Sequence, residues 1–234
     1  MICSRQGMFR FIVLCLLGAA CFSMPLHAQE FNFIEYNVGD GLSQSEVHTI
    51  CEDRRGQIWL GTDGGGLNRF DGKNFSVYTK DDGMLSNSVS SITETRDGKL
   101  WLGCQGLGVG YFDGNKFVNF SNEQYHIKIR AQVKVMEDRA GRIWISSVRG
   151  PLYEYRDGEF ITYDSSNGLL TNVIIGSNIR QDGNLWIGHD LGYSVFNGTQ
   201  FDAVSTQNIP GSPKTLFSSH FEIDGTTYFS GNRE

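Results

Sequence analysis

The chain repeats a short pattern at intervals of about 42 residues, and this period restricts its fold more than any other feature. Each copy has a polar turn with a glycine, then an aliphatic residue, a tryptophan and a second aliphatic residue. The tryptophans lie 42, 43 and 42 residues apart, at Trp59, Trp101, Trp144 and Trp186. The turn glycines are Gly56, Gly98, Gly141 and Gly183. Such a period, in a sequence rich in strand-forming residues, is typical of β-propeller blades.

Turn signals divide each repeat into four short strands. Glycine-rich and Asp-Gly turns separate the apolar segments, and in the first repeat they predict strands over residues 46–52, 57–62, 67–70 and 75–79. Four antiparallel strands in a repeat of this length form one blade. We predict full blades over residues 41–80, 83–121, 130–164 and 168–205, and part of a fifth over 214–234.

Residues 31–36 have the phase of a fourth strand, because they precede a Gly-Leu-Ser connection as residues 75–79 precede the next connection. The expected fold class is therefore all-β. It is an incomplete β-propeller with four full blades, a partial fifth blade and an N-terminal outer strand. The alternative is a five-bladed ring in which residues 31–36 complete the last sheet, although that blade would lack one strand.

The recurring aromatic residues are expected to form the core between blades, since flat side chains at a fixed phase fill the space between packed sheets. They close the third strand and open the fourth, at Phe70, Phe112, Tyr155 and Phe196 and at Phe75, Phe117, Phe160 and Phe201. The repeated tryptophans and turn glycines are interpreted as structural for the same reason.

The first 28 residues have the layout of a secretory signal peptide. Two arginines precede an apolar segment over residues 11–21, and Ala28 ends a small-residue cleavage site. We therefore predict a signal peptide over residues 1–28 and the propeller over 29–234. An uncleaved anchor is the alternative. A lipoprotein signal at Cys21 fits less well, because Gly18 stands where a large aliphatic residue is expected.

Charge and cysteine content exclude two classes of protein. The formal net charge is −6, and removal of the two leader arginines makes it −8, so a basic nucleic-acid-binding surface is not expected. Of five cysteines only Cys51 and Cys104 follow the leader, which excludes a disulfide-dense scaffold. Their pairing depends on a distance that sequence does not supply, and two small buried residues is the interpretation that we favour.

Three consecutive segments resemble a known family. They read Gly-Leu-Ser-x-Ser-x-Val-x-x-Ile at residues 41–50, Glu-Asp-x-x-Gly-x-Ile-Trp-Leu-Gly-Thr at 52–62 and Gly-Gly-Leu-Asn-Arg-Phe at 65–70. This pattern closely resembles two-component regulator propeller repeats, and the resemblance extends over residues 31–234. Such repeats form the periplasmic sensor region of hybrid sensor histidine kinases of Bacteroidetes.

The resemblance implies the start of a seven-bladed ring in a periplasmic, ligand-sensing domain. In the family, two propellers precede a β-sandwich, a membrane helix that anchors the protein in the inner membrane, and a dimeric kinase that feeds a phosphorelay. Residues 29–234 contain none of these later domains, so kinase activity and cofactors are not expected in this chain. The implied partners are an oligosaccharide or other small ligand, and the remainder of the sensor kinase in a homodimer.

Loops that differ between repeats are the candidate ligand-binding positions, because scaffold positions repeat whereas a specific site breaks the symmetry. Loops between second and third strands are expected at the same end as the connections between blades, where ligands usually bind propellers. The candidates in these loops are Asp63, Gln105, Arg149, His189 and Asp190. The alternative is that they are ordinary solvated residues.

A second departure from the repeat is the connection at residues 122–130. Tyr125 could stack there on a sugar ring, with Gln124 or His126 bonding its hydroxyls. An irregular loop without function is the alternative. The histidines after the leader show no spacing of metal ligands, so no metal site is expected.

Two other functions stay open beside the sensor. A secreted lyase or glycoside hydrolase could use a propeller scaffold, but a hydrolase needs two opposed carboxylates in a central pocket. The acidic residues here mostly recur in the turn of each blade, which indicates a structural role. A protein-interaction propeller would show a broad apolar face, whereas these loops are polar and glycine-rich.

Overall fold

The computed structural model describes residues 33–130, 132–180, 182–205, 215–223 and 226–233, with side chains as far as Ser205. It divides the chain into two units, residues 1–35 and 36–234, and all the blades lie in the second unit. The signal peptide expected over residues 1–28 lies outside the described residues and stays a prediction. In the described part of the chain, no helix has the length and apolarity needed to cross a membrane.

Four sheets of four antiparallel strands follow one another, each in chain order, and each falls inside a predicted blade range. Blade 1 has β1 (Val47–Glu52), β2 (Ile58–Thr62), β3 (Leu67–Phe70) and β4 (Phe75–Tyr78). Blade 2 has β5 (Val89–Glu94), β6 (Leu100–Cys104), β7 (Gly108–Phe112) and β8 (Phe117–Ser121). Blade 3 has β9 (Val133–Glu137), β10 (Ile143–Ser147), β11 (Leu152–Arg156) and β12 (Glu159–Tyr163). Blade 4 has β13 (Ile174–Ile179), β14 (Leu185–His189), β15 (Gly192–Phe196) and β16 (Phe201–Ser205).

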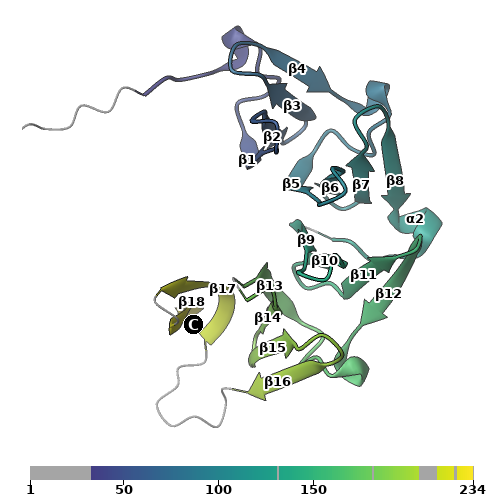
Figure 1. The fold of residues 1–234 in the computed structure, drawn as a ribbon, viewed down its shortest axis with the longest axis vertical. Coiled ribbons are helices and arrows are strands. Elements are labelled where there is room, and N and C mark those ends of the chain that lie inside the picture. The colour runs from purple at the N-terminus through teal and green to yellow at the C-terminus, as the bar shows by residue number, and fades with distance from the viewer. Residues whose placement is uncertain (1–32, 131, 181, 206–214, 224–225, 234) are drawn as a thin grey trace, which may run out of the picture. The chain divides into compact units, whose positions relative to one another are not determined.

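A fifth sheet has two strands, β17 (Thr215–Ile223) and β18 (Thr226–Arg233), as expected for a partial blade. The fold class is thus confirmed as all-β with propeller blades. The first strands β1, β5, β9 and β13 lie beside one another in order, and the fourth strands β4, β8, β12 and β16 lie on the far side of their blades (Figure 1).

A short helix precedes each four-stranded blade: η1 (Val38–Asp40), η2 (Lys80–Asp82), α2 (Asn122–Tyr125) and η3 (Ser165–Asn167). The three 3-10 helices end at Gly41, Gly83 and Gly168, which have φ of 105°, 96° and 96°. This left-handed conformation favours glycine and explains the Gly-Leu or Gly-Met pairs of the sequence. The connection through α2 ends instead at His126, with φ of 53°.

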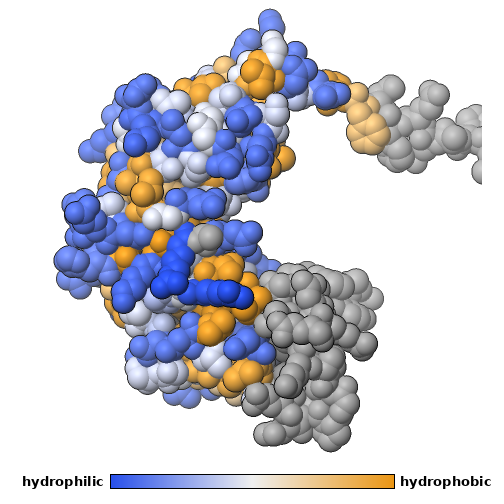
Figure 2. Space-filling model, turned by 180° about the vertical axis from the view of Figure 1, so that it is seen from behind, coloured by the Kyte–Doolittle hydropathy of each residue, from blue (hydrophilic) through white to orange (hydrophobic). Residues whose placement is uncertain are grey.

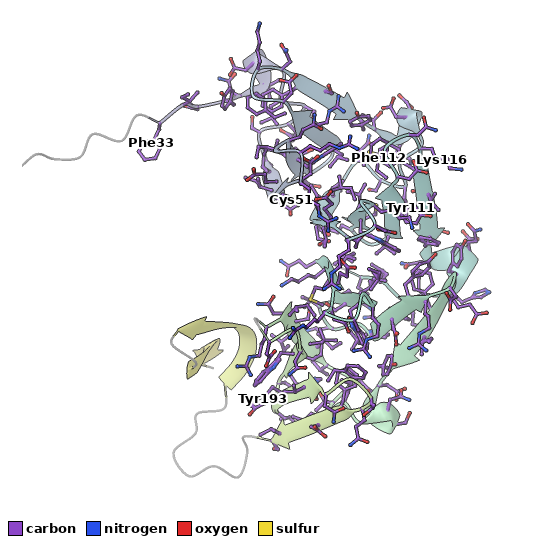
Figure 3. The ribbon with its side chains drawn as sticks, in the orientation of Figure 1. Phe33, Cys51, Tyr111, Phe112, Lys116 and Tyr193 are labelled. Atoms are coloured by element: carbon purple, nitrogen blue, oxygen red, sulfur yellow. The ribbon has the colours of Figure 1, made fainter. Side chains whose placement is uncertain are left out.

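The repeated tryptophans fill the interfaces between blades. Trp59 packs with core residues of blade 2, Trp101 with those of blade 3 and Trp144 with those of blade 4. Neighbouring residues on one strand serve different interfaces: Phe112 packs toward blade 1 and Tyr111 toward blade 3, and the two side chains point apart in Figure 3. Trp59, Trp101 and Trp144 therefore pack as core residues between blades.

Aspartates in the turns between first and second strands bond the tryptophan of their own blade. The Asp138 carboxylate accepts from the backbone N–H groups of Ala140 and Arg142, at 2.9 and 3.0 Å, and from Trp144 Nε1 at 3.0 Å. It also accepts from Arg142 Nε at 2.6 Å. These hydrogen bonds outweigh burial and lower the Asp138 pKa. Asp53 makes the same turn and indole bonds in blade 1.

A carboxylate clamp joins consecutive blades at this end. Glu94 accepts from the backbone N–H of Arg54 at 2.9 Å, and Glu137 accepts from the N–H of Arg96 at 2.9 Å. Both glutamates stand seven residues before a tryptophan. At the equivalent position blade 4 has Ile179, which has no acceptor. The clamp therefore joins blade 1 to blade 2 and blade 2 to blade 3, and stops there.

The N-terminal outer strand predicted over residues 31–36 is wrong for its described part, since residues 33–36 form no strand. A fourth strand needs a third strand to hydrogen-bond, and every described third strand already has its own fourth strand.

Cys51 and Cys104 are both free cysteines, as favoured above. Cys51 is partly buried and Cys104 is fully buried. Burial raises the pKa of Cys104 to about 12.

Candidate functional site

A groove of about 650 Å³ runs along the first strands of blades 1 to 4. Its walls come from β1, β5, β9 and β13, with further residues from neighbouring strands of blades 2, 3 and 4. The polar side chains among its lining residues are His48, Thr49, Ser90, Ser91, Thr93, Gln105, Gln132, Lys134, Ser146, Ser147, Ser177 and Asn178. Most of them are hydroxyls and amides, which can donate and accept hydrogen bonds.

The groove also has an aromatic wall. Trp186 and Tyr193, from β14 and β15, line it and stack on each other with ring centroids 4.7 Å apart and an interplanar angle of 17°. Aromatic faces beside a small number of polar groups are typical of sites for small ligands. Tyr193 is labelled on blade 4 in Figure 3.

Several polar side chains of the groove tie adjacent first strands together. Thr93 Oγ1 on β5 donates to the carbonyl oxygen of Val135 on β9 at 2.7 Å. Lys134 Nζ on β9 donates to the carbonyl oxygen of Ser177 on β13 at 2.8 Å. The Ser146 and Ser177 hydroxyls lie 2.6 Å apart. These bonds hold the strand backbones in position, so the groove wall is preorganised.

Lys134 carries the one ammonium group among the described lining residues. Its side chain is exposed to the groove, yet the surrounding walls desolvate the ammonium and lower the Lys134 pKa. Besides the Ser177 carbonyl, its Nζ approaches Asn178 Oδ1 at 3.4 Å. No carboxylate belongs to the described lining, so the electrostatic partners of this ammonium are neutral dipoles.

The loops predicted to share one end of the blades do so. The N–H of Gly66, in the loop after β2, donates to Asn87 O in the connection that enters blade 2, at 2.7 Å. Equivalent bonds of 2.8 Å join Gly106 to Arg130 and Arg149 to Ile174. The loops after the second strands are thereby fixed to the neighbouring blade.

Of the six side chains proposed as ligand contacts, Gln105 lies in the groove, where it is exposed. Asp63 is exposed and accepts from Ser88 Oγ at 2.7 Å. Arg149 is exposed on a left-handed turn with φ of 56°. Asp190 is half-buried and accepts from Thr171 Oγ1 at 3.1 Å. These last three are at the loop end but are not among the groove residues.

His189 is a structural residue, and its position does not support a role as a ligand contact. Its ring is fully buried, with Nδ1 3.1 Å from Val173 O and Nε2 2.9 Å from Ser194 Oγ. The Ser194 oxygen accepts from the backbone N–H of Leu170 at 2.9 Å, and its hydroxyl proton is directed to Nε2. Since the carbonyl requires a donor at Nδ1, the ring is the neutral Nδ1–H tautomer, and burial lowers the His189 pKa.

Tyr125 does not present its ring for stacking on a sugar. It lies on α2 and packs edge-to-face against Phe120 and Phe160, with ring centroids 5.1 and 5.7 Å away. The backbone of the same connection is held by Asn122, whose Oδ1 accepts from the N–H of Ile129 at 3.0 Å. The unusual sequence of this connection therefore builds an alternative core contact.

One cluster of ionisable side chains has the proximity of metal ligands. Ligand atoms of Glu46, His48 and Asp63 lie within 4.8 Å of one another. All three are exposed, and Glu46 and His48 already approach each other at 3.3 Å. Exposed groups of this kind are common without a metal, so the cluster carries no assignment.

The first strands, which line most of the groove, are not among the candidate positions that the loops suggested. A signal was present ten residues before each tryptophan, where the repeats have Thr49, Ser91, Lys134 and Gly176. Lys134 alone is charged there. On the face in Figure 2, hydrophilic residues surround smaller hydrophobic patches.

Two segments match a known family of repeats. Residues 41–64 and 83–106 match the family described as "Two component regulator propeller". Each segment spans a connection and the first two strands of a blade, in blade 1 and in blade 2. The recognition of these repeats in the sequence is therefore confirmed.

A sequence relative is a protein named histidine kinase P4 from Formosa agariphila. It is 42% identical over 71 residues, which are 30% of this chain and 5% of that protein. Because this chain spans so little of the relative's length, the comparison covers repeats and not a whole protein.

Solved structures share the fold. The extracellular domain of a putative hybrid two-component system from B. thetaiotaomicron has a TM-score of 0.68 at 20% identity, covering 84% of this chain and 29% of that one. A second such domain has a TM-score of 0.56 at 19% identity, covering 85% and 34%. Virginiamycin B lyase from Staphylococcus aureus has a TM-score of 0.58 at 14% identity, covering 80% and 64%. Identities this low show a common fold alone.

Proposed function

We propose that this chain, which carries two-component regulator propeller repeats, is the ligand-sensing start of the periplasmic region of a hybrid sensor histidine kinase. The supporting relatives are a histidine kinase and the extracellular domains of hybrid two-component systems. The predicted signal peptide would carry the chain across the inner membrane. Kinase activity would reside in other domains of the intact protein.

The groove along the first strands is the observation that carries a binding role. Its volume of about 650 Å³ is in the range of sites for small molecules. Hydroxyl and amide groups line it, and the stacked rings of the buried Trp186 and the partly exposed Tyr193 add an apolar part of the wall. A saccharide combines many hydroxyls with apolar ring faces, so we propose a glycan-derived oligosaccharide as the ligand.

Binding accounts for the groove better than glycoside hydrolysis does. A hydrolase needs two carboxylates facing the substrate, and the described lining residues include none. The turn acids Asp53 and Asp138 are instead engaged by their own turns and tryptophans. The similarity to virginiamycin B lyase is a similarity of fold alone.

In the intact protein, ligand binding would favour one arrangement of the propellers and so bias a dimeric kinase across the membrane. A ligand shifts such an equilibrium only by its difference in affinity for the two arrangements. The remainder of the sensor kinase, including a second copy of it, is thus the proposed protein partner.

Calorimetric titration of the chain with a panel of oligosaccharides tests this proposal. We expect at least one to bind, and Gln105→Ala to weaken that binding by roughly threefold to tenfold, the effect of one lost hydrogen bond. Asn115→Ala, on the exposed turn between β7 and β8, is the matched control and should change nothing. Absence of binding across the panel, or equal binding by Q105A, would refute the groove as the ligand site.

A further inference from the structure

We infer that the groove recognises an oxyanion on its ligand through Lys134 and Asn178, so that the saccharide is acidic. This inference rests on the proposed function and makes its ligand more specific. The oxyanion is a carboxylate or a sulfate ester, both of which present oxygen acceptors to an ammonium.

Comparison of the blades shows that the scaffold does not require a lysine at position 134. The equivalent residues are Thr49, Ser91 and Gly176, each paired with a glycine on the adjacent second strand. Lys134 is paired with Ser146 in the same register. Small residues thus suffice in three blades, and the charge in blade 3 is an addition to the repeat.

The ammonium of Lys134 has donor capacity left for a ligand. It has three N–H groups; one donates to Ser177 O at 2.8 Å and a second lies 3.4 Å from Asn178 Oδ1. Neither acceptor is charged, and no carboxylate lines the described groove. A cation without a counter-charge, in a wall that removes part of its hydration, favours an anionic ligand.

Asn178 provides a second donor beside Lys134. Its Oδ1 accepts from the backbone N–H of Ile179 at 3.1 Å and faces Lys134 Nζ. The amide oxygen is therefore occupied, and the Asn178 NH₂ group remains for the groove. The two donors come from β9 and β13, so one oxyanion could accept from two adjacent blades.

A purely structural role for Lys134 is the competing explanation. Thr93 ties β5 to β9 by a bond to a carbonyl oxygen, and Lys134 ties β9 to β13 in a similar way. A hydroxyl is sufficient for such a tie. Stability measurements alone would not separate the two roles, so the test has to measure ligand charge.

The experiment titrates the chain with three oligosaccharides of equal length and with inorganic sulfate. The saccharides are an oligogalacturonide, a sulfated galactan fragment and a neutral galactan fragment. We expect at least one acidic saccharide to bind about tenfold or more tighter than the neutral one, and its affinity to fall as salt is added.

Lys134→Gln should weaken acidic binding by roughly tenfold to a hundredfold, the effect of losing a charged hydrogen bond, and leave neutral binding unchanged. Lys134→Arg should restore much of the affinity, because it restores the charge. Asn178→Asp tests the same charge in a second way: a carboxylate beside Lys134 should abolish the preference for acidic ligands. Lys116→Gln is the matched control, since Lys116 is exposed on the outer turn of blade 2, away from the groove (Figure 3).

Each outcome has a distinct meaning. Equal binding of acidic and neutral saccharides, unchanged in K134Q and N178D, overturns the oxyanion inference and leaves the saccharide sensor standing. Sulfate binding as tight as that of any saccharide, and lost in K134Q, supports the oxyanion site and overturns the saccharide. Failure of every saccharide and of sulfate to bind overturns both.

Discussion

Replacement of Asp138 by alanine should destabilise the propeller more than any other single change in the turns. The carboxylate is 2% exposed and accepts four hydrogen bonds, two from the turn backbone, one from Trp144 and one from Arg142. Trp144 has no exposed surface, so its indole N–H would remain buried without a partner, which costs about 1–3 kcal/mol.

The other lost bonds add less, because their donors can reach water. The two turn N–H groups contribute about 0.5–1.5 kcal/mol each. The Arg142 guanidinium is partly exposed and also donates to Gly198 O at 2.8 Å, so it keeps a partner. We therefore expect Asp138→Ala to reduce the free energy of unfolding by about 3–5 kcal/mol.

Asp53→Ala in blade 1 is the matched comparison. Asp53 makes the same bonds to its turn and to Trp59, but it is less buried and Gln57 replaces the arginine. Its loss should cost about 2 kcal/mol. Urea unfolding followed by circular dichroism measures both variants. A cost for D138A equal to or below that of D53A would refute the argument from burial and hydrogen-bond count.

Two further effects are expected on stability. Histidine in the unfolded chain has a pKa of about 6.5, whereas burial lowers the His189 pKa in the folded chain. As pH falls below about 6.5, the unfolded chain therefore binds a proton that the folded chain does not. The free energy of unfolding should then fall by up to about 1.4 kcal/mol per pH unit until the folded pKa is reached. His189→Gln should reduce the dependence of the melting temperature on pH between pH 7 and 5. An unchanged dependence would contradict the assignment of His189 as a buried, neutral histidine. Glu137→Ala should lower the free energy of unfolding, measured in urea, by about 1 kcal/mol, because it removes a partly exposed hydrogen bond to the Arg96 N–H. Glu52→Ala is the control and should have no measurable effect, since Glu52 is exposed and makes no such bond. Equal effects of the two glutamate changes would argue against the clamp.

The sequence was sufficient to predict the blades because period, turns and strand residues all agree. The first strand was predicted over residues 46–52 and found at Val47–Glu52. The prediction over residues 31–36 relied on their position in the sequence repeat. That position does not supply the neighbouring strand with which a strand must form hydrogen bonds.

The candidate site was harder to predict, since variation between repeats marks both ligand contacts and local repacking. His189 stands three residues after its tryptophan, and the equivalent Thr62, Cys104 and Ser147 also pair with a first strand and are buried. Tyr125 varies because its connection packs differently on Phe120. The exposure that separates Gln105 from these residues depends on the folded structure.

The end of the carboxylate clamp at blade 3 has a mechanical consequence. Blades 1, 2 and 3 are fastened at their turn end by Glu94 and Glu137, while Ile179 leaves the next junction without this fastening. Lys134 and Asn178 stand on the two sides of that same junction, at the groove. At its turn end that junction has a different bond, from Arg142 Nη1 to Gly198 O at 2.8 Å. A ligand that bonds Lys134 and Asn178 would add a further link at the groove. Occupancy of the groove would therefore stiffen the junction between blades 3 and 4 beyond what these side-chain bonds provide.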